Sequence, residues 1–387
     1  MAMSLPLTQP TPLRAFALRV LLALDRLAVR HARIFPRYRL DPGLKLRIVL
    51  IGHAHLGDLL CFFPFLAYVL DKSPLVEWHV VGAPEMAALA DSFHLPVRFH
   101  GLGKGAGGGG FRYCHEIRKL CQRIPPDAGI SYSYDRYHWK HLAQYLARVP
   151  QRIGFDDKGF GLFLTSPVTY PPHTTYVEQI SRLLASLFDD EVVGQADLVY
   201  RRWLGRFGNR AGNRPASARK QLGVCLFGQH SFRWPMANWR TLLNALLDER
   251  TDLSVVFVGR QHDVGSRELV TWLQARYGGE RVADLMGKTT LTGVLDTMRT
   301  LDGLVTQDTG LRHLANLAGL PVVVLRQSES DPARWGRYVS TETVLTAPQP
   351  CSPCGLPVCR YDRVHCMEDI PVDRCKDAVR LILNLAL

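Results

Sequence analysis

The stretch Leu46-Arg-Ile-Val-Leu-Ile-Gly-His-Ala-His-Leu-Gly-Asp58 runs from six mostly apolar residues into a turn that contains two glycines. The apolar run at 46–51 predicts a short buried strand, and the spacing of apolar residues over 58–70 predicts a helix after the turn. The same pattern predicts further strands at 76–81 and 128–131 and further helices at 111–124 and 137–148. Strands that alternate with helices are typical of a parallel sheet with helices on both faces.

A second series of strands and helices begins after residue 220. Its strands are predicted at 223–227, 254–258, 303–306 and 322–325. Residues 201–220, between the two halves, contain seven basic residues and no acidic residue, a composition typical of a linker. The pattern predicts an α/β protein with two facing Rossmann-like domains. Because ligands bind at the carboxyl ends of the strands in such sheets, we expect the reaction site in the cleft between the domains.

The sequence therefore divides into five segments. They are a basic amphipathic helix at 1–45, a first domain at 46–200, a linker at 201–220, a second domain at 221–370 and a C-terminal helix at 371–387. In the first segment, Phe16, Val20, Leu24 and Leu27 recur at helical spacing among arginines. Such a helix can lie on an anionic membrane surface or pack against its own protein, and both alternatives stay open. The C-terminal helix is expected to pack back near the first domain.

The chain of 387 residues carries a formal net charge of +12 at pH 7, and 47% of its residues are apolar. The apolar content excludes a chain that is disordered throughout. The positive charge attracts anions such as nucleotide phosphates or anionic lipids, whereas no recognised motif accompanies it that would indicate a nucleic-acid partner. No apolar run reaches the roughly 18 residues of a membrane-spanning helix, and the N-terminus does not resemble a secretory signal. We therefore expect a cytoplasmic protein.

Asp58 lies where the first strand passes into its helix. A carboxylate near the start of a helix is a good cap. At the mouth of a cleft, the same carboxylate can act as a general base that takes a proton from an acceptor hydroxyl. This motif alone leaves both roles open.

The motif Thr306-Gln-Asp-Thr-Gly-Leu-Arg-His313 follows the predicted strand 303–306 and opens an apolar helical stripe. Thr309 and Gly310 are therefore expected at a helix N-terminus, where free N–H groups and the helix dipole bind a diphosphate. His313 can add a hydrogen-bond donor, and Asp308 can accept hydrogen bonds from sugar hydroxyls. Asp-Thr-Gly also occurs in aspartic proteases, but those are β-rich and use a paired second aspartate. Here a helix follows the triplet and the triplet occurs only once, which argues against a protease.

Three further residues or pairs are expected near the donor. Lys288 and Thr289 follow Gly287 but lack the earlier glycine of a P-loop, since Val282 occupies its position, so they predict a loop that contacts phosphate. The alternative is an ordinary polar turn. Arg233 is expected to neutralise a departing diphosphate. Asp263 follows a predicted strand and is expected to bind ribose hydroxyls.

Four cysteines, Cys351, Cys354, Cys359 and Cys366, fall within sixteen residues. Four thiols so close together can surround a structural Zn or Fe ion, although their spacing is not that of a zinc ribbon. The alternative is a set of reduced thiols without a metal. The cluster is expected to lie away from the catalytic motifs and to play no part in the reaction.

Several of these motifs occur in the order found in glycosyltransferase family 9, the heptosyltransferase family. They are Gly57-Asp58 with Pro64, Arg152-Ile-Gly-Phe155, Gly287-Lys-Thr289, Asp308-Thr-Gly310 with His313, and Asp331-Pro-Ala-Arg-Trp-Gly336. From about Leu46 to its C-terminus the chain resembles this family. The resemblance implies a GT-B fold and an inverting transfer of heptose from ADP-heptose to a hydroxyl of a lipopolysaccharide core acceptor. It also implies that no metal is required for catalysis, that Asp58 is the base, and that Asp308, Thr309, Gly310 and His313 bind the donor.

The chain departs from the family at one position. Many members carry a lysine two residues before the Trp234-Pro235 pair, where this chain has Phe232. Arg233 can substitute, although arginine and lysine are not equivalent. Three alternative functions therefore remain. The enzyme uses another nucleotide sugar, it transfers to a protein acceptor in place of a glycolipid, or the protein binds a nucleotide sugar and is catalytically inactive.

Overall fold

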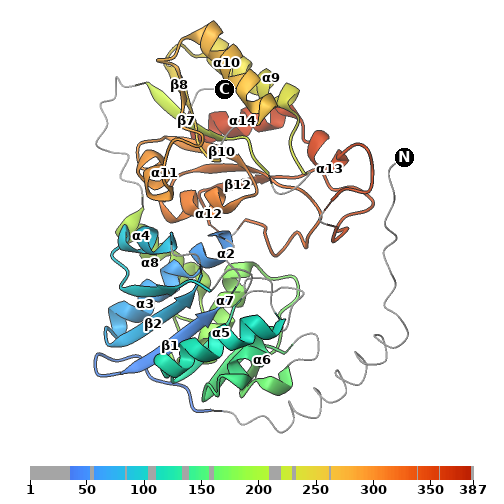
Figure 1. The fold of residues 1–387 in the computed structure, drawn as a ribbon. Coiled ribbons are helices and arrows are strands. Elements are labelled where there is room, and N and C mark those ends of the chain that lie inside the picture. Colours follow the sequence, from blue (N-terminus) through green and yellow to red (C-terminus); the bar gives the residue numbers. More distant parts are fainter. Residues whose placement is uncertain are drawn as a thin grey trace.

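The computed structural model describes residues 35–384 except 53–55, 83–84, 103–109, 133–138, 157–160, 209–218, 229–231, 261–262, 338 and 357. Most of the predicted N-terminal helix, residues 1–34, lies outside the described residues. Two parallel sheets follow along the chain, each with six strands. Figure 1 shows them as separate layered units, with the first half of the chain below and the second half above.

The first sheet has the order β3-β2-β1-β4-β5-β6. Its strands are β1 (Leu46–Ile51), β2 (Val76–Val81), β3 (Val97–His100), β4 (Ala128–Ser131), β5 (Gln151–Phe155) and β6 (Ser166–Val168). The helices of this half are α2 (Leu56–Leu60), α3 (Phe63–Lys72), α4 (Met86–Asp91), α5 (Gly110–Arg123), α6 (Trp139–Leu146), α7 (Tyr176–Ala185) and α8 (Ala196–Phe207).

The second sheet repeats this arrangement with the order β12-β11-β10-β7-β8-β9. Its strands are β7 (Lys220–Cys225), β8 (Leu253–Phe257), β9 (Val282–Asp284), β10 (Gly303–Gln307), β11 (Val322–Leu325) and β12 (Glu342–Leu345). Its helices are α9 (Met236–Glu249), α10 (Val264–Tyr277), α11 (Leu291–Met298), α12 (Gly310–Leu317), α13 (His365–Glu368) and α14 (Val372–Ile382).

Both sheets reverse their strand order at one point. In the first, the chain builds outward from β1 to β3 and then returns to place β4 on the other side of β1. In the second, β7 and β10 are the corresponding neighbours. Loops on the two sides of such a point diverge and leave a crevice at the carboxyl ends of the strands. The structure therefore confirms the predicted α/β class with two Rossmann-like domains and locates one such reversal in each.

The two domains share a continuous apolar interface. One cluster of buried side chains contains residues of both sheets, among them Leu59 and Phe62 of the first half and Leu314 and Leu317 of the second. Trp203 on α8 donates a hydrogen bond from its indole nitrogen to the carbonyl oxygen of Leu317 at 2.8 Å. In Figure 1, α2 and α12 lie at this boundary.

The structure differs from the sequence expectations in the helices. The helix predicted over 58–70 is two helices, because Pro64 has no N–H to continue the hydrogen bonding and instead opens α3. The linker predicted at 201–220 begins later, since α8 continues to Phe207 and buries Trp203 against the core.

The prediction that the C-terminal helix packs near the first domain is wrong. Helix α14 packs on α9 and on strands β10 to β12, and its buried Cys375 and Val379 belong to the second domain's core. The reason lies in its apolar stripe, which completes the face of the second sheet (Figure 1). Among the residues that the structure describes, no helix is long and apolar enough to cross a membrane.

Candidate active site

The carboxyl ends of β7 and β10 meet at the reversal of the second sheet. Thr309 caps α12, and its hydroxyl accepts a hydrogen bond from the Leu311 N–H. Gln307, at the end of β10, donates to the Leu226 carbonyl and accepts from the Trp234 N–H at 2.8 Å. These bonds hold the loop after β7 beside the start of α12. Thr309 and Gly310 thus occupy the helix N-terminus that the sequence places there.

The loop that carries Lys288 and Thr289 reaches the same edge. Gly287 has a positive φ of 68° and donates its N–H to the carbonyl of Gly259, at the end of β8, at 3.0 Å. A side chain at Gly259 would in turn contact Leu311 in the first turn of α12. Lys288 extends into solvent and pairs with Asp284 at 2.7 Å. The loop therefore lies beside the start of α12, with its cation held by a carboxylate.

Arg233 and Asp263, which the sequence suggests separately, form one ion pair. Asp263 also caps α10, because its carboxylate accepts the Ser266 N–H at 2.9 Å and Ser266 bonds back to its N–H. Burial alone would raise the pKa of Asp263, but the hydrogen bonds from Ser266 and Arg233 lower it overall. The carboxylate is therefore ionised and holds Arg233 beside the start of α10.

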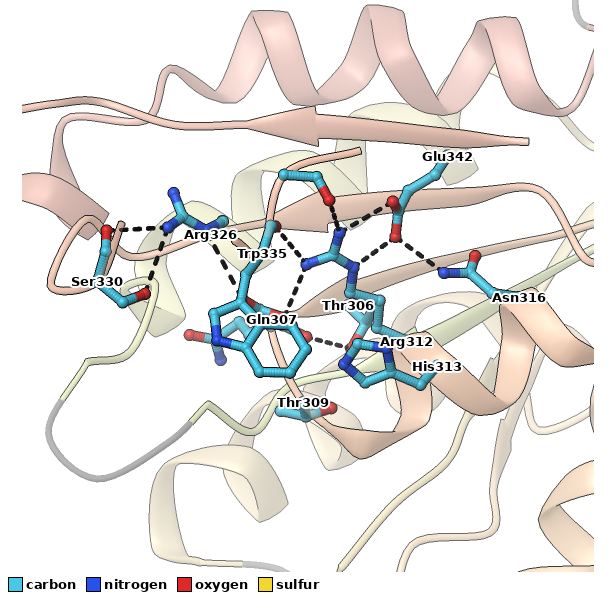
Figure 2. Close-up of polar contacts among 12 residues, drawn as sticks. Thr306, Gln307, Thr309, Arg312, His313, Asn316, Arg326, Ser330, Trp335 and Glu342 are labelled. Atoms are coloured by element: carbon cyan, nitrogen blue, oxygen red, sulfur yellow. Dashed lines mark hydrogen bonds and ion pairs between the residues drawn. The ribbon is translucent and has the colours of Figure 1, made fainter. Parts of the chain in front are cut away.

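Asp308 belongs to a buried ionic network that the sequence analysis missed. Arg312, in the first turn of α12, donates to both carboxylate oxygens of Glu342, to Asp308 at 3.0 Å and to the carbonyls of Trp335 and Gly336 (Figure 2). Every N–H direction of its guanidinium is thereby used. In the sequence, nothing distinguishes Arg312 from the other arginines of this basic protein. Only its position on the buried side of an apolar helical stripe could have indicated that it forms a buried ion pair.

A second arginine approaches Asp308 from the other side. The Nε atom of Arg326, just after β11, lies 3.8 Å from the second carboxylate oxygen of Asp308. Both guanidinium groups are buried, and Asp308 itself is only 11% exposed. The carboxylate therefore anchors the residues that begin α12, and any hydrogen bond to a sugar would add to these two contacts.

His313 faces the other domain. Burial, reinforced by the charge of Arg312, lowers the pKa of this imidazole to about 3, so the ring is neutral at pH 7. Its Nδ1 atom lies 3.5 Å from the sulfur of Cys61, and its ring packs edge-on against Trp335. His313 therefore lies at the domain boundary, where it can donate only as a neutral ring.

Asp58 occupies the reversal of the first sheet. It is the third residue of α2, so it lies inside the first helical turn rather than at the cap position. Tyr132 follows β4 on the other side of the reversal, and Tyr176 donates its hydroxyl to the Tyr132 carbonyl at 3.1 Å. Burial first, and then the negative charge of Asp58, raise the pKa of both tyrosines, so both stay protonated. The charge of Asp58 therefore acts on two buried, protonated tyrosines beside the reversal.

Two glycines bring the domains together beside Asp58. A Cβ atom on Gly57 would lie 2.6 Å from the His313 ring, and one on Gly310 would lie 2.7 Å from the Leu56 side chain. The starts of α2 and α12 thus pack directly on each other. Because Asp58 follows Gly57 and Thr309 precedes Gly310, the carboxylate of one domain and the helix N-terminus of the other meet at one boundary.

The cysteine segment lies against the loop that follows β11. Gly355 donates its N–H to the carbonyl of Glu329 at 2.7 Å, which places the segment against the loop after β11. Burial raises the pKa of the Cys366 thiol, and negative charge on Cys359 or Cys354 would raise it further. The segment therefore contacts the loop that also carries Arg326, and its separation from the catalytic motifs stays a prediction.

Metal binding by these cysteines stays a prediction. No disulfide joins the nine cysteines, all of which lie in the described part of the chain. Within those same described ranges, no three His, Cys, Asp or Glu side chains are placed to bind a single ion.

The fold agrees with comparisons to known proteins. The model of "Glycosyltransferase family 9 (heptosyltransferase)" matches residues 140–365. The structure resembles the E. coli ADP-heptose LPS heptosyltransferase II, with a TM-score of 0.60, 17% identity, and coverage of 88% of this chain and 99% of that one. It also resembles E. coli heptosyltransferase WaaC with ADP, with a TM-score of 0.62, 17% identity and coverage of 87% and 100%.

A third similar structure is the iron-containing dodecameric glycosyltransferase TibC from enterotoxigenic E. coli, with a TM-score of 0.53, 13% identity and coverage of 90% of this chain and 78% of that one. No curated protein matches the chain significantly. At these identities, the likeness to the solved structures shows the shared fold.

Proposed function

Since this chain belongs to glycosyltransferase family 9, we propose that it transfers heptose from ADP-heptose to a hydroxyl of a lipopolysaccharide core acceptor, with inversion at the anomeric carbon. The observation that carries the proposal is the direct packing of α2 on α12. It brings Gly57, the residue before Asp58, against His313 of α12, and Gly310, which opens α12, against Leu56. The similar structures are named for ADP-heptose or hold ADP, which supports this donor.

In the proposed reaction, Asp58 takes the proton of the acceptor hydroxyl as that oxygen attacks the anomeric carbon. The bond from this carbon to the diphosphate breaks on the opposite face, and the configuration inverts. The N–H groups at Thr309 and Gly310 receive the departing diphosphate, together with the dipole of α12. Arg233 and Lys288 neutralise its charge, so the transfer requires no metal ion.

The other residues at the edge bind or position the donor in this proposal. Asp263 serves the ribose hydroxyls while it holds Arg233, and Thr289 contacts phosphate from its loop. Asp308 keeps the start of α12 in place through Arg312 and Arg326 and accepts a sugar hydroxyl on its remaining exposed side. His313 donates as a neutral ring.

The acceptor belongs to the first domain in this proposal, and the donor to the second. The net charge of +12 suits a phosphorylated glycolipid and an anionic membrane surface. We place the enzyme in the cytoplasm, peripherally on the inner face of the inner membrane.

A panel of donors tests the proposal. ADP-heptose at about 100 times its dissociation constant should stabilise the protein by roughly 2.7 kcal/mol, which a thermal shift detects. Transfer from the stabilising nucleotide sugar is then measured with lipopolysaccharide core and with protein acceptors. Stabilisation by another nucleotide sugar would mean that ADP-heptose is not the donor. Transfer to protein alone would mean that the acceptor is a protein, and binding without transfer would indicate an inactive sensor.

Arg233→Ala is expected to lower turnover more than it weakens donor binding. The diphosphate gains negative charge as the bond breaks, so a cation beside it stabilises the transition state more than the bound donor. Steady-state kinetics and calorimetric binding of ADP measure the two effects. Arg240→Ala is the matched control, because Arg240 lies on α9 with its guanidinium over the ring of Trp272 on α10. Equal losses in turnover and binding would mean that Arg233 makes a uniform binding contact.

We further propose that Cys351, Cys354, Cys359 and Cys366 bind one structural Zn or Fe ion; the similar TibC is named as iron-containing. Purified protein should then contain about one equivalent of metal, and Cys354→Ser should remove it and lower the melting temperature. Cys121→Ala, in the apolar core of the first domain, should keep the metal. Metal-free wild-type protein with full activity would contradict this proposal and would mean that the four cysteines are reduced thiols.

A further inference from the structure

Helices α5 and α6 lie side by side in one layer over the first sheet (Figure 1). Their inward side chains belong to one buried cluster with Val49, Ile51 and Val81 of the sheet. Gly110 opens α5 after β3, and Trp139 opens α6 after β4, so both helices begin near the carboxyl ends of these strands. This is the edge at which the ligands of such sheets bind.

Large apolar side chains stay exposed on the outer side of this layer. Phe111, in the first turn of α5, is 79% exposed, and Tyr145 and Leu146, at the end of α6, are 49% and 37% exposed. The Phe111 ring packs edge-on against Trp139 with centroids 5.6 Å apart, and Trp139, Leu142 and Leu146 recur along one stripe of α6. Exposed apolar side chains that gather on one surface mark an interaction site, whereas single ones do not.

The outer side of α5 is also positively charged along its length. Its exposed residues lie on one face of the helix and include four cations, Arg112, Arg118, Lys119 and Arg123. Glu116 is the single acidic residue in the two helices, and it pairs with Lys119 at 3.6 Å. Among the described residues, none forms an ion pair with any of the three arginines. The outer sides of both helices, here called the α5–α6 face, thus combine exposed apolar groups with uncompensated cations.

We propose that the α5–α6 face docks the protein on a membrane that contains anionic lipids. In this mode of binding, aromatic and leucine side chains enter the boundary between headgroups and acyl chains, while arginine and lysine attract the anionic headgroups. The charge of the face is complementary to such a surface, since four cations stand against one paired carboxylate. An acceptor anchored in that membrane would meet the first domain at the edge where Phe111 and Trp139 lie.

This inference deepens the proposed function by naming the surface that meets the membrane, but its test requires neither the donor nor transfer. The full chain is mixed with vesicles of phosphatidylcholine, or of phosphatidylcholine and phosphatidylglycerol, at low and at physiological ionic strength. Co-sedimentation measures the bound fraction. One double variant, Phe111→Ser with Leu146→Ser, removes apolar contacts, and a second, Arg112→Gln with Arg118→Gln, removes charge.

The matched control is Leu381→Ser with Arg374→Gln, which makes one change of each kind on α14. Both of its side chains are exposed on the second domain. The melting temperature of every variant is measured first, and the control should bind vesicles like wild type.

Wild type is expected to bind the anionic vesicles and to bind phosphatidylcholine alone far more weakly. The arginine variant should bind the anionic vesicles roughly 25-fold more weakly, because each cation near the surface contributes about fivefold. This difference should shrink as salt screens the charges. The apolar variant should bind about tenfold or more weakly at both ionic strengths, because it loses buried apolar area.

Wild-type affinity for anionic vesicles in either double variant would show that the α5–α6 face is not the docking surface and would overturn the inference. Failure of wild type to bind these vesicles would also overturn it. Variants that keep vesicle binding but lose transfer to a water-soluble acceptor fragment would mean that the face binds the acceptor instead. Vesicle binding that depends on the face, in a protein that transfers no heptose, would support the inference while refuting the proposed reaction.

Discussion

Asp58→Asn is expected to fold, to bind ADP with wild-type affinity and to lose transfer by roughly a hundredfold or more. Asparagine has nearly the shape of aspartate but cannot take the proton of the acceptor hydroxyl. Asp58 lies at the reversal of the first sheet, on the helix that packs against α12. Because the two side chains have nearly the same size, the variant differs from wild type only in charge and basicity. Melting temperature, ADP affinity and turnover are measured side by side.

The matched control is Asp71→Asn. Asp71 lies on α3, is more than half exposed and pairs with Arg206 at 2.6 Å, so the same change of side chain there should leave turnover unchanged. Wild-type turnover should also fall at acid pH as the base becomes protonated, and Asp58→Asn should lack that dependence. An asparagine variant that keeps most of its turnover would remove Asp58 from the mechanism and leave it a helix-stabilising carboxylate.

Arg312→Met is expected to lower the free energy of unfolding by about 3–5 kcal/mol. The change leaves Glu342, whose side chain is fully buried, without its cation, and removes the link from Asp308 to the loop at 335–336. An uncompensated buried carboxylate is far more costly than a lost surface pair. Because Asp308 loses its anchor, ADP affinity should fall as well. Denaturant unfolding and calorimetry measure the two effects.

Two variants show whether the cost arises from the unpaired charge. Arg299→Met breaks an exposed pair with Asp296 and should cost less than about 1 kcal/mol. The double variant Arg312→Met with Glu342→Leu removes both members of the buried pair and should recover part of the lost stability, because no carboxylate is left stranded at position 342. A cost near that of Arg299→Met for the single Arg312 variant would mean that the network contributes little.

The sequence determined the local elements that carry the site. Strands β1, β2, β4 and β11 begin and end where the apolar runs predict, because a strand covered on both faces is apolar along most of its length. The motifs that contain Asp58 and Thr309 were correctly placed after strands for the same reason. The strands it missed include the outermost ones, where polar residues such as Arg98 and Glu342 interrupt the pattern.

Only the tertiary structure decided which of these residues meet. Arg312 and Glu342 are thirty residues apart and pair because β12 lies next to β11 at the edge of the sheet, an order that no local period encodes. The pairing of Arg233 with Asp263 and the packing of α14 on the second domain arise in the same way. Apolar periodicity predicts a helix or strand because which face a residue occupies depends on its spacing from its near neighbours along the chain. The packing of Tyr176 on Trp335, by contrast, depends on the two domains coming together, and that depends on all the surfaces they bury.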